Sequence, residues 1–170
     1  MKKWLLFFTL ILTIYCQGQT TVIPDPNFEQ RLIDMGYDSA PIDGVILTTN
    51  INTVTSLSVP LSNISDLTGI EGFEALENLD TSGNPITSLD LSQNTGLINI
   101  FIGQNELTSL NVSNCVALEV LVCQGTLLGS LDLSNNTNLR LLNCVNNQLT
   151  NLDLSNNIQL THLSVNENLL

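Results

Sequence analysis

The sequence predicts a mostly β solenoid in which coils of 21 to 22 residues stack their short strands in parallel behind an N-terminal capping helix. Three observations predict this fold. The phrase Leu-x-x-Leu-Asp-Leu-Ser-x-Asn recurs every 21 residues from about Ile86 to the last residue. Its Leu-x-Leu part alternates with the period of a strand. No segment after Gly36 has the period of a helix, so neither side of the coil is predicted to be helical.

Five positions in each coil form columns along the solenoid. Parallel strands lie about 4.8 Å apart, so each inward side chain is expected to sit on its equivalent in the next coil. Two upstream units fit the same spacing, with one 22-residue step between Ile64 and Ile86. The columns are Val54, Leu76, Leu97, Leu118, Leu139, Leu160; Leu57, Leu79, Ile100, Leu121, Leu142, Leu163; Val59, Thr81, Ile102, Cys123, Cys144, Val165; Ser62, Asn84, Asn105, Thr126, Asn147, Asn168; and Ile64, Ile86, Leu107, Leu128, Leu149, Leu170.

A second copy of the phrase lies inside each coil. Ile86, Leu89, Leu91 and Asn94 have the same spacing as the column positions, so one strand is expected on each side of the coil. Bends that carry Asn would join these strands. We expect each buried Asn amide to bond backbone groups and its own copy in neighbouring coils.

Residues 1–18 have the features of a secretory signal peptide. Lys2 and Lys3 precede an apolar run of twelve residues, 4–15, and small residues at Cys16 and Gly18 suit cleavage after Gly18. The run is short for a membrane span. A lipid anchor on Cys16 is a rival interpretation, disfavoured by the bulky Tyr15 before it, and an uncleaved anchor helix is disfavoured further.

Residues 19–50 are predicted to form an N-terminal cap. Asp25 and Pro26 signal a helix start, and an apolar stripe follows up to Gly36, so we expect a helix over 26–35. Residues 45–47 are a candidate first strand. Residues 51–170 carry the repeats and stop on an apolar column position, so we expect the C-terminal cap to be absent and the sequence to be a fragment.

The charge after Gly18 is strongly negative. All 16 acidic residues lie there beside only two bases, Arg31 and Arg140, which leaves a net charge of −14. Such a surface repels phosphate backbones, so nucleic acid is excluded as a partner. We interpret this charge as one that keeps a flat β-rich surface soluble, in preference to one that attracts cations.

We interpret the three cysteines of the mature chain as core residues and not as disulfide-forming, metal-binding or redox groups. Their odd count and wide spacing are not typical of a disulfide framework. Cys123 and Cys144 share an inward column with no third ligand, which favours small core residues over a metal or redox pair. Cys115 stands where Asn94 and Asn136 stand in neighbouring coils. We therefore predict no cofactor and no metal site.

Two further polar patterns are candidate sites. His162 and Ser164 share the outward face of one strand, but no orienting acid or oxyanion site accompanies them, so we predict that the chain is not an enzyme. Asp90, Asp132 and Asp153 stack 21 residues apart, and Ca²⁺ could relieve their repulsion. Asn111 interrupts the column and no Gly-rich loop is present. A solvated surface is favoured, and Ca²⁺ binding stays open.

The repeats resemble those of bacterial leucine-rich repeat proteins. The 22-residue unit Ile64–Pro85 is similar to an internalin repeat, and the 21-residue units resemble those of secreted proteins from Bacteroidetes-type bacteria. The phrase Ile23–Glu29 resembles the start of such proteins. The resemblance implies a right-handed leucine-rich-repeat solenoid whose parallel-sheet face is often the binding side.

Outward positions on the second series of strands predict that binding face. Its members are Asn99, Phe101, Val120, Val122, Leu141, Asn143, Val145 and His162. Five of them would form a contiguous apolar patch, a feature typical of partner surfaces. We expect a secreted or cell-surface module that binds a protein or a glycan. The alternatives are a structural spacer within a larger surface protein, and an enzymatic activity that resides in a missing C-terminal domain.

Overall fold

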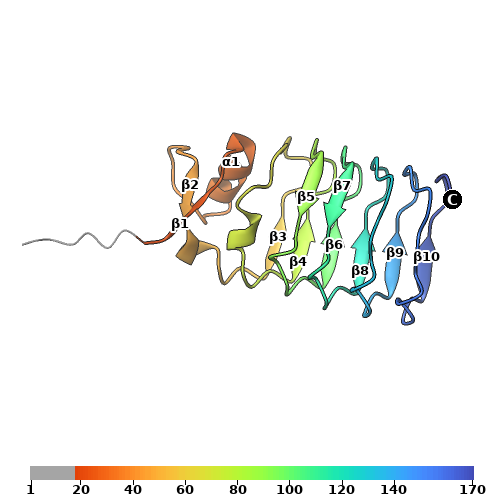
Figure 1. Ribbon diagram of the computed structural model, residues 1–170. Coiled ribbons are helices and arrows are strands. Elements are labelled where there is room, and N and C mark those ends of the chain that lie inside the picture. Colours follow the sequence, from red (N-terminus) through yellow and green to blue (C-terminus); the bar gives the residue numbers. More distant parts are fainter. Residues whose placement is uncertain (1–17) are drawn as a thin grey trace, which may run out of the picture.

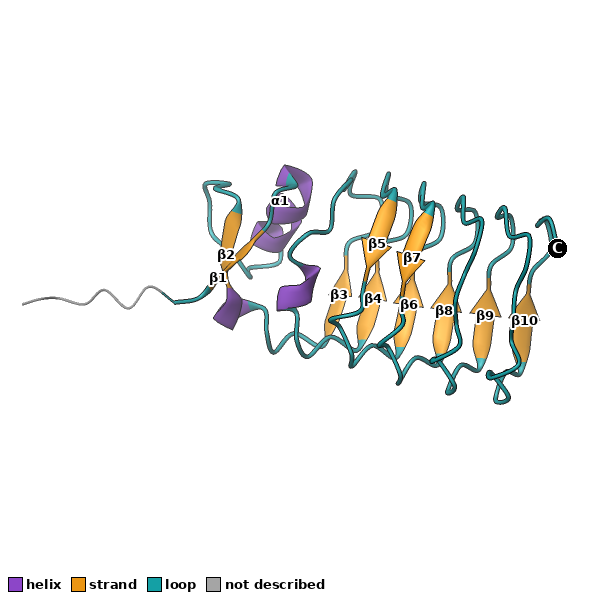
Figure 2. Cartoon of the chain, in the orientation of Figure 1, coloured by secondary structure: helices purple, strands orange, loops and turns teal. Residues whose placement is uncertain are grey.

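A single row of coils behind an N-terminal cap makes up the computed structural model, which describes residues 18–170 (Figure 1). The predicted signal peptide, residues 1–18, lies outside the described residues except for Gly18. Figure 2 shows that strands and loops dominate the coils and that the α-helix belongs to the cap. The elements are β1 (Thr20–Val22), α1 (Pro26–Asp34), β2 (Val45–Leu47), β3 (Ser56–Ser58), β4 (Asn78–Asp80), β5 (Ser88–Asp90), β6 (Asn99–Phe101), β7 (Ser109–Asn111), β8 (Val120–Val122), β9 (Leu141–Asn143) and β10 (His162–Ser164), with 3₁₀ helices at Thr48–Asn50 and Ile70–Gly72.

One side of the solenoid is a six-stranded parallel sheet in the order β3-β4-β6-β8-β9-β10. The strands pair with a shift of one repeat, so that Ile100 faces Leu79 on one side and Leu121 on the other. This register confirms the predicted columns and the predicted solenoid. We call the outward side of this sheet the strand face.

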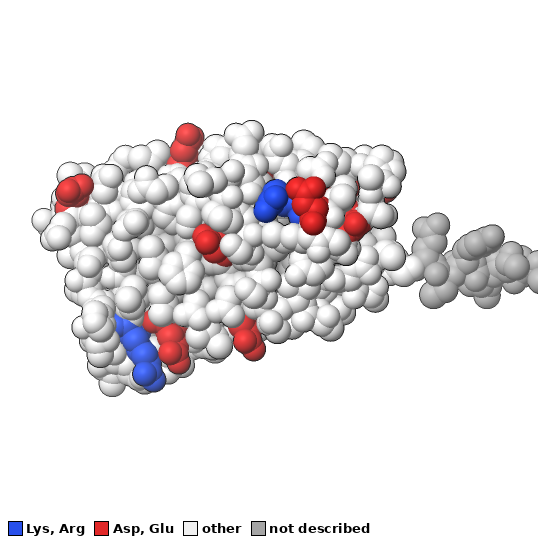
Figure 3. All heavy atoms as spheres, turned by 180° about the vertical axis from the view of Figure 1, so that it is seen from behind, with Lys and Arg blue, Asp and Glu red and all other residues white. Residues whose placement is uncertain are grey.

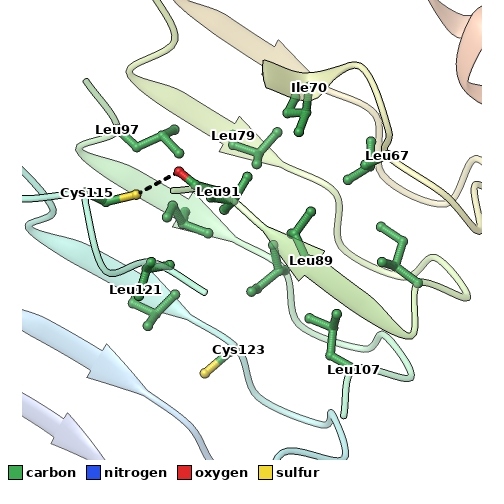
Figure 4. Packing of buried hydrophobic residues seen from close by; sticks show 14 of the residues in the cluster. Leu67, Ile70, Leu79, Leu89, Leu91, Leu97, Leu107, Cys115, Leu121 and Cys123 are labelled. Atoms are coloured by element: carbon green, nitrogen blue, oxygen red, sulfur yellow. Dashed lines mark hydrogen bonds between the residues drawn. The ribbon is translucent and has the colours of Figure 1, made fainter. Parts of the chain in front are cut away.

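The inward columns form a continuous apolar core along the solenoid. Leu79, Leu121 and Cys123 are at most 1% exposed, and Figure 4 shows such side chains packed against one another between the two sides of the coils. The column of Leu79 and Leu121 is less buried in the last coil. There Leu163 is 48% exposed, whereas Leu142 in the preceding coil is 1% exposed. Burial of a column position therefore depends on having a coil on each side of it.

The opposite flank is less regular than the repeat predicts. Within residues 18–170 only β5 and β7 pair there, and residues 130–132 and 151–153 are not strands. Alternation sets the direction of each side chain, but pairing also needs neighbouring backbones at hydrogen-bond distance. Asparagine side chains link the coils here instead, each at 3.1 Å: Asn114 Nδ2 donates to Ser92 O, Asn135 Nδ2 to Ser113 O and Asn156 Nδ2 to Ser134 O.

The first unit departs further, because its opposite flank contains the 3₁₀ helix Ile70–Gly72. The prediction that neither side is helical is therefore wrong at this turn. Gly69 precedes it with φ = 102°, and a Cβ on Gly69 would lie 2.3 Å from Ile23 Cδ1. A Cβ on Gly72 would lie 2.6 Å from Thr21 Oγ1. Two glycines thus let this turn approach the cap closely.

The cap is built around α1, which ends one residue before the predicted boundary, with Met35 as its C-cap. Asp25 Oδ1 accepts hydrogen bonds from Asn27 N at 2.9 Å and Phe28 N at 3.0 Å, as an N-cap residue should. The predicted strand 45–47 is present as β2, and it pairs antiparallel with β1. Phe28 stacks on Phe73 with ring centroids 6.4 Å apart, which joins the cap to the first unit.

Asparagine columns hold the bends. Asn84 Nδ2 donates to Val59 O and Thr81 O, both at 2.9 Å. Its Oδ1 accepts from Ser62 N at 2.9 Å and Ile64 N at 3.0 Å. Its partners are thus backbone groups of its own and the preceding coil. The expected bonding between copies occurs in the described columns only where Thr126 Oγ1 bonds Asn147 Oδ1.

The second Asn column, which contains Asn94, Asn136 and Asn157, makes fewer hydrogen bonds than the column of Asn84. Asn136 Nδ2 donates to Val112 O at 3.0 Å and Cys115 O at 2.9 Å. The Oδ1 atoms of Asn94, Asn136 and Asn157 are buried and have no hydrogen-bond partner among residues 18–170. The two columns therefore stabilise their bends to different degrees.

No helix among residues 18–170 combines the length and the apolar character that crossing a bilayer requires.

Candidate protein-binding face

The strands β3, β4, β6, β8 and β9 bury their central residue and turn their first and third residues outward, whereas all three residues of β10 are exposed. The in-register pairing aligns these outward residues in two columns. The columns are Ser56, Asn78, Asn99, Val120, Leu141, His162 and Ser58, Asp80, Phe101, Val122, Asn143, Ser164.

The structure brings four of the predicted apolar residues together. Phe101 faces Val122 across β6 and β8, and Val120 faces Leu141 across β8 and β9. Phe101 is 39% exposed and the other three are half-buried. We call Phe101, Val120, Val122 and Leu141 the apolar patch.

Two asparagines flank this patch on the strand face. Asn99 Nδ2 donates to Asn78 Oδ1 at 2.7 Å, and Asn143 Nδ2 donates to Gln124 Oε1 at 2.7 Å. These bonds link neighbouring coils across the surface. The patch is therefore bounded by oriented amides on both sides along the solenoid.

Val145 lies outside the strands of this face, and His162 borders the patch on β10. Asn143, not Val145, continues the column of Phe101 and Val122, and Val145 lies two residues past the end of β9. His162 is exposed on β10 beside Leu141, and its Nδ1 lies 3.0 Å from Thr161 Oγ1. No hydrogen bond joins His162 to Ser164 within residues 18–170.

A shallow depression lined by both polar and apolar side chains adjoins the patch and was not predicted from the sequence. Its volume is about 210 Å³, and its lining consists of Phe101, Leu57 and Leu79 together with Ser56, Ser58, Asn78 and Asp80. The column spacing, continued upstream through the 22-residue step, is the signal that identifies these residues. The strand face thus changes from polar to apolar at β6.

The aspartate column lies on the opposite flank, where it shapes turns. Asp90 Oδ1 accepts from Ser92 N at 2.8 Å, and Asp132 and Asp153 bond Ser134 N and Ser155 N in the same way. Hydrogen bonds from Ser92 lower the pKa of Asp90, and backbone hydrogen bonds from Ser134 and Ser155 lower the pKa of Asp132 and Asp153. These bonds are those of Asx turns, in which an aspartate side chain accepts from the backbone two residues on. A groove of about 300 Å³ runs beside Asp132 and Asp153.

Cys115, Cys123 and Cys144, the three cysteines among residues 18–170, are buried and free. Cys115 Sγ lies 3.4 Å from Leu91 O, the contact drawn in Figure 4, and so replaces an asparagine amide in its column. Burial raises the pKa of Cys115 and of Cys144 to about 11. Burial and the nearby Cys144 also raise the pKa of Cys123. These thiols stay protonated at neutral pH and behave as small core residues. Within residues 18–170, no group of three or more His, Cys, Asp or Glu side chains could hold a metal ion.

Charged side chains are sparse on the surface. Figure 3 shows scattered acidic groups, with each basic group beside an acidic one. Arg31 pairs with Asp34 at 3.3 Å and Arg140 pairs with Glu119 at 3.6 Å. Both arginines of the described chain are therefore already engaged, which leaves most carboxylates uncompensated.

Comparisons place this geometry among known proteins. No family model matches the chain. Internalin J of Listeria monocytogenes serotype 4b is 40% identical over 72 residues, which are 42% of this chain and 8% of that protein. The chain thus spans a small part of the curated relative that it matches.

Solved structures of internalins superimpose over most of the chain. The functional domain of InlJ from Listeria monocytogenes, described as including a cysteine ladder, has a TM-score of 0.79 and 39% identity, covering 87% of this chain and 33% of that one. An internalin, InlF, from Listeria monocytogenes has a TM-score of 0.77 and 29% identity, covering 86% of this chain and 44% of that one. A leucine-rich repeat protein of Leptospira interrogans, 22% identical with a TM-score of 0.66 over 71% of this chain and 33% of that one, shares the fold.

Proposed function

Because this chain is an internalin-like leucine-rich repeat protein, we propose that it is a binding module that engages a partner protein through its strand face. The observation that carries the proposal is the apolar patch. Phe101, Val120, Val122 and Leu141 lie together on a surface whose other outward positions are Ser, Asn, Asp and His. A contiguous apolar surface of this kind is typical of an interaction site.

We propose that the module acts outside the cell, secreted or on the outer surface. The predicted signal peptide supports this location, and so does the likeness to internalins. A glycan is the second ligand class. The depression beside Phe101 supports it, since the serine, asparagine and aspartate side chains in its lining can bond hydroxyl groups. The protein ligand is preferred because the patch itself is apolar.

The proposal is tested by placing a charge in the patch. Val122→Lys and Leu141→Lys variants of the full chain are compared with wild type on an array of extracellular proteins and on a glycan array. We expect protein binding to be lost in both, because a buried unpaired ammonium opposes association strongly. Ser130→Lys, at an exposed position on the opposite flank, is the control and should bind like wild type.

Circular dichroism and thermal unfolding accompany the binding assay. If both patch variants unfold while the control does not, the assignment of outward positions is wrong. If they fold and bind as well as wild type does, the patch is not the binding surface and the spacer interpretation is favoured. Binding confined to the glycan array would replace the partner protein by a sugar.

A further inference from the structure

The depression next to the apolar patch has a carboxylate with no counter-charge. Asp80 Oδ1 accepts a hydrogen bond from Ser82 N at 3.0 Å, and Oδ2 accepts none among residues 18–170. Asp80 is half-buried, which makes its charge harder to solvate than that of a surface aspartate. The two arginines of the described chain pair with Asp34 and Glu119. The Asp80 carboxylate is therefore available to a cation from outside.

An aromatic ring stands next to this carboxylate. Asp80 and Phe101 are directly paired across β4 and β6, so their side chains leave the sheet about 5 Å apart. Phe101 is 39% exposed and lines the depression. A ring face next to a carboxylate suits a cation, which gains both an ion pair and a cation–π contact.

The other residues that line the depression leave room for a bound side chain and add one hydrogen-bonding group, the Asn78 amide. Ser56 and Ser58 are small, and they form the side of the depression away from Phe101. Asn78 Oδ1 is occupied by Asn99 Nδ2, so the Asn78 amide presents N–H donors. Such donors suit a main-chain carbonyl of a bound polypeptide.

From this juxtaposition we infer that the depression receives an arginine side chain of the partner protein. The guanidinium bonds the Asp80 carboxylate and stacks on Phe101, while the apolar patch takes neighbouring apolar side chains of the same partner. Arginine suits the site better than lysine because its planar group can stack and bond at once. This inference rests on the proposed function and names the chemistry of its ligand.

The inference is tested by NMR titration of the ¹⁵N-labelled full chain with N-acetyl-arginine methylamide. The isosteric neutral probe, N-acetyl-citrulline methylamide, is titrated in parallel. We expect saturable shifts at Asp80, Ser82 and Phe101 with the arginine probe only, weakened by added salt because the contact is partly exposed.

Two variants and a matched control complete the test. Asp80→Asn keeps the acceptor for Ser82 N but removes the charge, and it should weaken the arginine probe about tenfold. Phe101→Leu should weaken it about threefold. Asp153→Asn removes a carboxylate that accepts the same kind of bond, from Ser155 N, on the opposite flank, and should change nothing.

Equal shifts with both probes, or no effect of Asp80→Asn, would overturn the inference. So would shifts at these amides with an oligosaccharide but not with arginine. The probe is too small to cover the apolar patch. If the titration fails but the wild-type chain still binds a protein that the Val122→Lys and Leu141→Lys variants do not bind, only the arginine site is rejected.

Discussion

The junction between the cap and the first unit, and the regular coils after Ile86, are held together in opposite ways. At the junction, Asp25 accepts five hydrogen bonds, two inside its own helix and three from Ser65 and Asp66. Inside the cap, the fully buried Glu29 accepts from Asp43 N at 2.7 Å and Gly44 N at 2.9 Å. In the coils, by contrast, similar leucine and asparagine contacts recur from one coil to the next.

The difference shows where single residues matter. The junction depends on a few charge-assisted bonds that occur once, so the loss of one group leaves several buried or partly buried donors without their acceptor. A coil position is supported by equivalents above and below, so its contribution depends on its place in the row.

Removing the Asp25 carboxylate should be the most damaging change. Asp25→Ala leaves the donors of Phe28, Ser65 and Asp66 unpaired, and we expect a loss of about 4 kcal/mol in unfolding free energy. Urea denaturation measures this loss. Asp43→Ala is the control, since the exposed Asp43 accepts only a local bond from Val45 N and should cost below about 1 kcal/mol. Similar losses in both variants would refute the special role of the junction.

Leu121 and Leu163 lie in one column, and replacing each by alanine should lower the free energy of unfolding by different amounts. Leu121→Ala, fully buried in the middle of the row, should cost about 3 kcal/mol because it leaves a cavity. Leu163→Ala, 48% exposed in the last coil, should cost below about 1 kcal/mol. Thermal or urea unfolding gives both values. Equal costs would show that burial in this column does not depend on neighbouring coils.

The two asparagine columns should differ as well. Asn84→Ala removes four hydrogen bonds and should cost about 2 kcal/mol more than Asn136→Ala, which removes two. Asn136→Cys should be milder than Asn136→Ala, because Cys115 already occupies that column. Urea midpoints of the three variants test the order, and a reversed order would contradict the assigned bonding.

Acid should loosen the junction. Burial raises the pKa of Asp25, but hydrogen bonds from Ser65, Phe28 and Asp66 outweigh it and hold the pKa below its ordinary value of 3.8. A lowered folded pKa contributes stability that is complete above the unfolded value and is lost as the pH falls through the folded value. Urea midpoints measured from pH 5 to pH 2 should fall, and fall less steeply in Asp25→Asn. The aspartates at 90, 132 and 153 have lowered pKa values too and supply the remaining slope.

Much of the regular part was predictable from the sequence. The 21-residue spacing identified the inward columns, and the alternation around Ile100 and Leu121 identified the outward residues of the apolar patch. Asp25 and Pro26 marked the start of α1. These signals are local or periodic, so they can be recognised in a single amino-acid sequence. The depression beside Phe101 was not predicted, because its lining comes from three strands of three different coils and its shape depends on how their side chains pack.

The sequence by itself determined which side chains point inward, because strand alternation and a constant repeat leave no other way to bury the leucines. Only the tertiary structure decided that the opposite flank pairs at β5 and β7 alone, that Ile70–Gly72 turns as a 3₁₀ helix, and that Asp80 lies beside Phe101. These features depend on the distance between neighbouring coils and on the approach of the cap. That distance is set by all the contacts of a coil together, and no single repeat encodes it.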